Sequence, residues 1–353
     1  MTPASAERAA FHEFIARHRR FLLTTHINPD GDGLGSEAAM AMWLEAQGKQ
    51  AVALNDSVMP PAFAFLARHA AFEVYEPEAA ERHFGEADAV VVLDTSNRQR
   101  IGRLAQVLDR HAVPIAVVDH HVTHARGFGQ VNVIEAEASA TGEIVYDLIR
   151  EGGGTITPAI AEALYVALMT DTGSFRYSNT DSHAHRMAAE LLTHGLDPQA
   201  LHAQVHSHAS AGRLRFFGEV LSALELLADG RLVVLEANPE HFHRHGLEGA
   251  DTDGLVDLPR TIAGVEAVAL FSEVEPGKVK VSLRSTGRVS VDQVCSRLGG
   301  GGHVHAAGVL LRGSRAEARA RILPELMSLI DALPPRAGAE APAGPPITKS
   351  GGR

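Results

Sequence analysis

Three short apolar runs in the first half of the chain each end on a carboxylate or an imidazole. Residues 21–26 have the sequence FLLTTH, residues 90–94 VVVLD and residues 115–121 IAVVDHH. Helical segments separate these runs, and such alternation predicts an α/β domain with a mostly parallel sheet. The carboxyl ends of parallel strands share one edge of a sheet, where ligands bind. We therefore expect the residues at the three ends to converge.

Most of these terminal residues are types that bind metal. The first run is followed by His26, Asp30 and Asp32, the second ends on Asp94, and the third ends on Asp119, His120 and His121. Carboxylates crowded at one edge raise one another's pKa unless cations neutralise them. Mixed imidazole and carboxylate ligands suit Mn²⁺, Co²⁺, Fe²⁺ or Zn²⁺ better than Ca²⁺. The sequence therefore predicts bound divalent metal.

These side chains are numerous enough for two ions. We expect His26 and Asp30 to hold one ion, Asp32 and His120 to hold the other, and Asp94 to lie between them. Two ions about 4 Å apart can activate a water and stabilise charge on a phosphoryl oxygen during in-line attack. The predicted chemistry is therefore hydrolysis at phosphorus.

Three further acids and histidines have predicted roles at this site. Asp171 follows the apolar helical segment YVALMT and is a candidate to complete the second ion site. His121 would face the substrate as a phosphate donor or general acid. Asp119 would orient a ligating histidine. Together with Asp94, His121 and Asp119 form the predicted catalytic group.

Each acid also has a structural alternative. A single aspartate at a strand end commonly caps a turn or a helix, and Asp94 or Asp171 taken alone would have that role. The segment NPDGDGLGS, residues 28–36, is dense in turn formers, so we expect a turn there and a helix capped by Ser36. The coincidence of three strand ends favours metal, because buried acids without partners are costly.

The second half of the chain has a different pattern. It carries the strand-like segments GRLVVLEAN and GVEAVALFSEVEPGKVKVSLRS, the latter predicting a hairpin around Pro276 and Gly277. The tail is rich in Pro, Gly and Ala, which predicts disorder. The predicted parts are an α/β domain over residues 1–190, a helical connector over 191–217, a smaller α+β domain over 218–333 and a disordered tail over 334–353.

Composition excludes several classes of protein. The formal net charge is -11, and proteins that bind long duplex nucleic acid usually have a basic face. No apolar stretch reaches the length of a membrane span, and the N-terminus has no segment fit for secretion, so we expect a cytoplasmic protein. Cys295 is the single cysteine, which excludes an intrachain disulfide and a thiolate metal cluster.

The metal-site segments are together specific enough to suggest a family. HINPDGDGLGS, VVLDTSN, VVDHH and LMTDTGSFRYSNT resemble, in this order, the four metal-site motifs of the DHH phosphoesterase superfamily. The later segments VKVSLRS and GGGGHVHAAG resemble its companion domain, DHHA1. The resemblance runs from Phe21 to Leu311. The chain looks most like the NrnA-type subgroup, whose members are oligoribonucleases that often also remove the 3′-phosphate of pAp.

The resemblance implies a complete metal site. It implies two divalent ions, Mn²⁺ first with Mg²⁺, Co²⁺ or Zn²⁺ as alternatives, and an Asp94 that bridges them. The implied ligands are His26, Asp30, Asp32, Asp94, His120 and Asp171. All four motifs are intact, which favours an active enzyme. A homodimer is usual among relatives and is a further possibility for this chain.

The DHHA1-like segments predict where substrate is bound. Glycines expose backbone N–H groups to an anion, and an arginine offers a planar fork to a phosphate. The alternative is a glycine loop that only turns the chain. The predicted substrate-binding residues are Arg284, Ser285, Gly300, Gly301, Gly302 and His303, together with Arg176 of the first domain.

We therefore predict a metal-dependent phosphoesterase whose two domains face across a cleft. Its substrates would be short oligoribonucleotides, including dinucleotides such as pApA, with pAp as a second substrate. One alternative is a phosphodiesterase specific for cyclic di-AMP or pApA, which would share every predicted catalytic residue. An alternative of another class is a non-catalytic nucleotide sensor or RNA-binding module, which a missing metal ligand would have favoured.

Overall fold

The computed structural model describes residues 3–334 except residues 122–126, 208, 248–251 and 253. The chain divides into two compact units, Met1–His208 and Ala209–Arg353. The division falls inside the predicted connector, residues 191–217, so that α8 (Pro198–His206) belongs to the first unit and α9 (Ala211–Ser222) to the second. The predicted disordered tail lies outside the described residues from residue 335 onward.

The first unit contains a six-stranded sheet in which every pair of neighbours is parallel, as predicted. The spatial order is β3-β2-β1-β4-β5-β6. The strands are β1 (Arg20–Thr24), β2 (Gln50–Asn55), β3 (Phe72–Val74), β4 (Ala89–Leu93), β5 (Ile115–Asp119) and β6 (Val131–Ile134). The direction of strand order reverses between β1 and β4. In open parallel sheets, ligands bind beyond the carboxyl ends of the strands at such a reversal.

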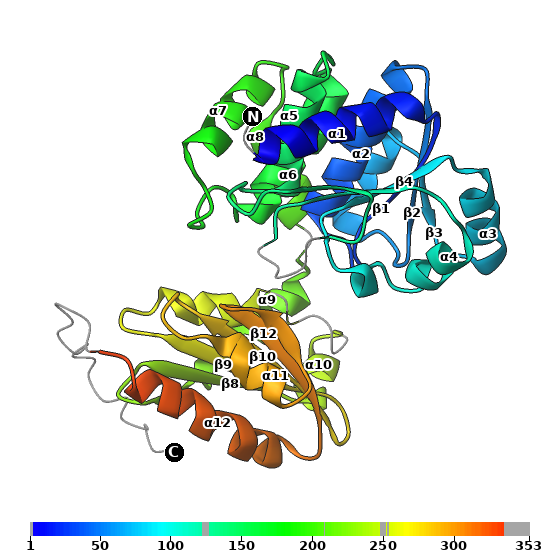
Figure 1. The fold of residues 1–353 in the computed structure, drawn as a ribbon. Helices are drawn as coiled ribbons and strands as arrows, with labels where there is room; N and C mark the ends of the chain where they lie inside the picture. Colours follow the sequence, from blue (N-terminus) through cyan, green and yellow to red (C-terminus); the bar gives the residue numbers. More distant parts are fainter. Residues whose placement is uncertain (1–2, 122–126, 208, 248–251, 253, 335–353) are drawn as a thin grey trace, which may run out of the picture. The chain divides into compact units, whose positions relative to one another are not determined.

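Helices cover both faces of this sheet (Figure 1). They are α1 (Pro3–Arg17), α2 (Gly31–Ala46), η1 (Pro61–Arg68), α3 (Pro77–Glu86), η2 (Arg98–Ile101), α4 (Leu104–Arg110), α5 (Thr141–Glu151), α6 (Pro158–Asp171), α7 (Ser182–Leu192) and α8. One core contains apolar side chains of α1, α2, α5 and α6, and a second contains those of α3 and α4. Because both faces are covered, every residue of β4 and β5 is buried, which explains their continuous apolar sequences.

Helix α2 begins earlier than the sequence predicts. Its N-cap is Asp30, whose side chain accepts hydrogen bonds from the backbone N–H groups of Asp32 and Gly33, so the prediction of a cap at Ser36 is wrong. The glycines of this segment permit close packing within the first helical turns. A Cβ at Gly33 would lie 2.4 Å from Oγ1 of Thr25, and one at Gly35 would lie 2.4 Å from the carbonyl oxygen of Ala163.

The second unit contains a mixed six-stranded sheet with the order β11-β12-β10-β9-β8-β7. Its elements are α9, β7 (Glu225–Leu227), β8 (Leu232–Ala237), α10 (Pro239–Arg244), η3 (Leu255–Thr261), β9 (Ala267–Glu275), β10 (Lys278–Ser285), α11 (Val291–Arg297), β11 (Gly301–His303), β12 (Ala306–Arg312) and α12 (Arg315–Asp331). Helices α11 and α12 share one core with the sheet, and α9, α10 and η3 share another. The predicted α+β fold class is confirmed.

The predicted hairpin of the second unit joins β9 and β10, with Gly277 at a φ of 75°. The glycine-rich segment is only partly a loop. Residues Gly301–His303 form β11 and pair with β12. A Cβ at Gly302 would lie 2.4 Å from the carbonyl oxygen of Ala306, so close pairing requires glycine there. In the described part of the chain, the helices all fall short of the length and apolar character needed to cross a membrane.

Candidate metal centre

The end of β1 and the start of α2 place a histidine and an aspartate beside the end of β4. Nε2 of His26 lies 3.3 Å from Oδ2 of Asp94 and 3.7 Å from Oδ2 of Asp30. His26 and Asp94 are buried, whereas about half of the Asp30 side chain is exposed. These three side chains form one group of potential metal ligands.

A second group combines residues from three separate elements. Nε2 of His120 lies 3.6 Å from Oδ2 of Asp32 and 3.5 Å from Oδ2 of Asp171. Asp32 lies in the first turn of α2, His120 follows β5 directly, and Asp171 is the last residue of α6. The predicted convergence of these residues is therefore present in the structure.

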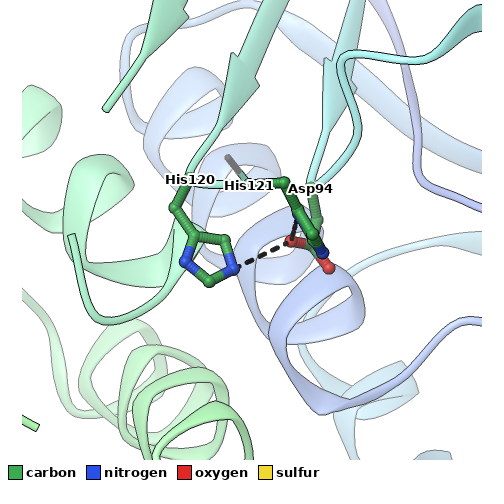
Figure 2. Close-up of side chains that lie close together, drawn as sticks. All are labelled: Asp94, His120 and His121. Carbon is green, nitrogen blue, oxygen red and sulfur yellow. Dashed lines mark ion pairs between the residues drawn. The ribbon is translucent and has the colours of Figure 1, made fainter. Parts of the chain in front are cut away.

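Asp94 lies between the two groups and offers one carboxylate oxygen to each. Its Oδ2 faces His26, whereas its Oδ1 lies 3.7 Å from Nε2 of His120 and 3.5 Å from Nδ1 of His121 (Figure 2). Asp94 has a φ of 62°, which is uncommon for a residue other than glycine. Strained backbone of this kind concentrates at functional sites.

Hydrogen bonds fix the tautomers of two histidines. Nδ1 of His26 lies 2.8 Å from the carbonyl oxygen of Ile27, and Nδ1 of His120 lies 3.1 Å from that of Ala138. A carbonyl oxygen only accepts, so in each ring Nδ1 carries the proton. In a neutral ring, the Nε2 lone pair then faces the carboxylates, which is the arrangement of a histidine metal ligand.

His121 is held differently. Oδ1 of the fully buried Asp119 accepts hydrogen bonds from Nδ1 of His121 at 2.8 Å and from its backbone N–H at 3.1 Å. Burial lowers the pKa of His121, but the hydrogen bond to Asp119 and the charge of Asp94 outweigh this effect and raise it. Asp119 was expected to orient a ligating histidine, and the residue that it orients is His121.

The carboxylates of the site are electrostatically crowded. Burial, followed by repulsion from Asp94 and Asp171, raises the pKa of Asp32 well above its usual value. Burial and repulsion from Asp94 likewise raise the pKa of Asp171 to about 6. Burial lowers the pKa of His26, but the adjacent carboxylates of Asp30 and Asp94 outweigh it and raise this pKa to about 10. The cluster therefore attracts positive charge.

The N-terminus of α5 stabilises two of these carboxylates, and sequence reasoning missed it. The backbone N–H groups of Thr141 and Gly142 donate to Oδ2 and Oδ1 of Asp32 at 2.7 and 2.9 Å. Oγ1 of Thr141 donates to Oδ1 of Asp94 at 2.9 Å. A helix N-terminus favours anions. The only sequence signal was a helix start within SATGE.

The loop after α6 holds Asp171 in place. Nδ2 of Asn179 donates to Oδ2 of Asp171 at 3.3 Å and to the carbonyl oxygens of Asp171 and Ser139 at 3.2 and 2.9 Å. Arg176, a predicted substrate-binding residue, is exposed, and its Nε donates to the carbonyl oxygen of Gly173 at 2.7 Å. Asn179 thus orients a potential ligand, whereas Arg176 presents its charge at the surface.

The predicted substrate-binding residues of the second unit lie near one end of β10. Nε of Arg284 is 3.5 Å from Oδ1 of Asp257. Ser285 is buried, and its hydroxyl oxygen accepts from the backbone N–H groups of Gly287 and Val289, so it stabilises the chain after β10. Gly301 and Gly302 are exposed and lie in β11, and Gly300 directly precedes that strand. The side chain of His303 lies outside the described structure.

The geometry of the first-unit cluster fits divalent metal ions. Two ligands at about 2.1 Å from one ion are separated by roughly 3.0 to 3.4 Å when they subtend a right or tetrahedral angle. The nitrogen–oxygen separations of 3.3 to 3.7 Å around His26 and His120 are close to this range. Histidine nitrogen combined with carboxylate oxygen suits a transition metal. The Asp/His cluster could therefore hold metal.

Comparisons with known proteins agree with this arrangement. Residues 20–168 match the DHH family, N-terminal domain, and residues 229–331 match the DHHA1 domain. The chain is 34% identical to the bifunctional oligoribonuclease and PAP phosphatase NrnA of Thermus thermophilus, over 82% of this chain and 84% of the relative. It is 25% identical to the protein of the same name from Bacillus subtilis, over 83% and 90%.

A solved structure supports the relationship. The fold resembles the crystal structure of an exopolyphosphatase-related protein from Bacteroides fragilis with a TM-score of 0.86, at 26% identity and over 92% of this chain and 96% of that one. The resemblance that the sequence motifs indicated is confirmed. The chain belongs to the DHH family, with a DHH domain followed by a DHHA1 domain.

Proposed function

We propose that this protein is a two-metal phosphoesterase that hydrolyses short oligoribonucleotides, including dinucleotides such as pApA, to mononucleotides. We propose pAp as a second substrate, from which it removes the 3′-phosphate. The observation that carries the proposal is the position of Asp94, whose two oxygens face two separate groups of ligands. Relatives named for both activities support the choice of substrates.

The ions would be held by the two groups described above. One would bind His26 and Asp30, the other would bind Asp32, His120 and Asp171, and Asp94 would serve both. The ligand types favour Mn²⁺, with Mg²⁺, Co²⁺ and Zn²⁺ as alternatives. When bound, two such ions supply an activated water and neutralise charge on the phosphoryl oxygens.

His121 would act on the substrate. Its Nδ1 donates to Asp119 at 2.8 Å, and we propose that its Nε2 contacts a phosphate oxygen. A donor positioned at the oxygen on which charge develops stabilises the transition state more than the ground state. Asp119 fixes the orientation of the ring, as a buried carboxylate does for a histidine in other hydrolytic sites. We propose that Arg284 and the glycines of β11 bind a phosphate of the nucleotide.

The charge of the protein favours short substrates. A net charge of -11 offers no general attraction for a long polyanion. A few fixed donors bind a few phosphates, so each further nucleotide adds repulsion and little binding. We expect turnover per molecule to be highest for RNA of roughly two to four nucleotides, from the reach of a few extended units.

A substrate panel tests the proposal. The rates of phosphate release from pAp and of nucleotide release from pApA, cyclic di-AMP, pyrophosphate, single-stranded DNA and RNA of graded length would be measured with Mn²⁺ and with a chelator. Metal-dependent turnover of pAp and of the shortest RNA is expected. Absence of turnover for every compound would contradict the proposal and indicate a binding protein. Highest efficiency on cyclic di-AMP, or faster turnover of long RNA with steep salt dependence, would reassign the substrate.

A further inference from the structure

We infer that Arg100 is a substrate-binding residue of the first unit that contacts a phosphate of the substrate at the metal centre. The inference rests on the proposed function. Arg100 belongs to η2, the short helix that follows Asp94 in the chain. It lies in neither the metal-ligand set nor the group of residues assigned to phosphate binding in the second unit.

The backbone fixes Arg100 among the strand ends that carry the metal ligands. Its carbonyl oxygen accepts a 2.7 Å hydrogen bond from the backbone N–H of Ile27, the residue that follows His26. The next residue, Ile101, is fully buried in the core beneath. Gly102 has a φ of 63°, and a Cβ there would lie 2.6 Å from the Asp56 side chain and 2.7 Å from that of Ile27. The turn is therefore held between the ends of β1, β2 and β4.

Two neighbouring arginines of the same segment form ion pairs and contacts with aromatic rings. Arg98 forms an ion pair with Asp109 and lies over the ring of Phe128. Arg103 donates from its backbone N–H and its Nε to Oδ1 of Asp56 at 2.8 and 2.7 Å, and its guanidinium lies 4.2 Å from the ring centre of Tyr75. The charge of each guanidinium is therefore paired with a carboxylate of the first unit.

Arg100 differs from both neighbours. Its side chain is half-buried, and among the described residues its guanidinium has neither a hydrogen bond nor an ion pair. A guanidinium that is anchored by its backbone beside Ile27, among the strand ends, and has no carboxylate partner in the described part of the chain is suited to an anionic ligand. The five N–H donors of a guanidinium match the oxygens of a phosphate.

Variants of the metal-loaded protein test the inference. In Arg100→Ala, kcat/KM for pAp and pApA should fall roughly 30- to 300-fold, as expected for loss of a charge-assisted phosphate contact. Arg100→Lys should recover part of this loss, since it restores the charge without the fork. Arg98→Ala is the matched control and should stay within about twofold of wild type. The Mn²⁺ content of Arg100→Ala should be unchanged, because the contact to Ile27 uses the backbone.

Inorganic phosphate provides a readout that is independent of turnover. Its affinity for the Mn²⁺-loaded protein, measured by calorimetric titration, should fall at least about tenfold in Arg100→Ala. Wild-type affinity in this variant, or activity within about twofold of wild type, would overturn the inference. Loss of Mn²⁺ would also overturn it, because Arg100 would then support the metal ligands. If the wild type turned over neither nucleotide, the proposed function would fail, and the phosphate titration would still decide the role of Arg100.

Discussion

The hydroxyl of Thr141 donates a 2.9 Å hydrogen bond to Oδ1 of Asp94. The backbone N–H of Thr141 donates to Asp32 at 2.7 Å, so one residue at the N-terminus of α5 orients two buried carboxylates from different elements. Both residues, Asp32 and Asp94, are only 1% exposed. Their mutual repulsion is reduced by these donors and by the positive end of the helix.

Replacing Thr141 with valine should weaken metal binding and turnover while the fold persists. The substitution preserves the shape and removes one hydrogen bond to a charged group, which contributes about 1.5–3 kcal/mol. Mn²⁺ affinity and kcat for pApA should each fall by roughly tenfold or more. Thr141→Ser retains the hydroxyl and is the matched control. Equal Mn²⁺ titration curves for Thr141→Val and wild type would show that the hydroxyl does not orient Asp94.

Asp94→Asn should abolish turnover and lower the content of both ions, because one carboxylate serves both groups of ligands. The fold should persist, since the substitution removes negative charge from a crowded site. Asp88→Asn is a suitable control: Asp88 directly precedes β4, as Asp94 directly follows it, and pairs with Arg20. Elemental analysis and circular dichroism would measure metal and fold. Retention of both ions and of activity would contradict the two-metal assignment.

Protonation of Glu37 makes the free energy of unfolding depend on pH. It is fully buried in α2, its Oε2 accepts from Asn55 at 2.8 Å, and burial raises its pKa to about 8. The folded state therefore holds a proton that the unfolded state releases near its ordinary pKa of about 4.3. The stabilisation is fully present below that ordinary pKa and is lost as pH rises toward 8.

Glu37→Gln keeps a neutral side chain at every pH and should remove this loss. Its free energy of unfolding relative to wild type should increase between pH 5 and pH 8, by on the order of 1–3 kcal/mol. Glu45→Gln, at an exposed position of the same helix, should show no comparable change. Urea denaturation at several pH values would measure the difference. A constant difference between Glu37→Gln and wild type across this range would show that Glu37 is ionised in the folded protein.

Arg284→Ala should separate substrate binding from metal binding. Loss of a charge-assisted phosphate contact should lower kcat/KM for pApA by about 2–3 kcal/mol, or tens- to hundreds-fold. Metal content should not change, because Arg284 belongs to the second unit and the metal ligands to the first. Arg312→Ala, at the other end of the β10–β12 pair, is the control. An Arg284→Ala protein that lost Mn²⁺ would contradict the assignment.

The sequence by itself determined the fold class, the convergence of the ligands and the family. The alternation of strands with helices and the apolar runs are patterns of residues that are close in the sequence. The carboxyl ends of parallel strands lie at one edge of their sheet. Placing His26, Asp94 and His120 together therefore required no knowledge of which strands are neighbours. The local sequence was not sufficient to predict the first residue of α2, because it indicated Ser36 as the cap. Asp30 is the cap because tight packing of the glycines against Thr25 and α6 allows the helix to start well before Ser36.

Only the tertiary structure decided how these residues are oriented. The strand order places the reversal between β1 and β4, and the turn at Asp94 directs its two oxygens toward different histidines. The contacts of Thr141 with Asp94 and of Asn179 with Asp171 join distant segments. In the part of the chain that the structure describes, Arg98 pairs with Asp109 and Arg103 with Asp56, whereas the Arg100 guanidinium has no carboxylate partner. Such contacts follow from packing between elements remote in the chain, which no local pattern of residues encodes.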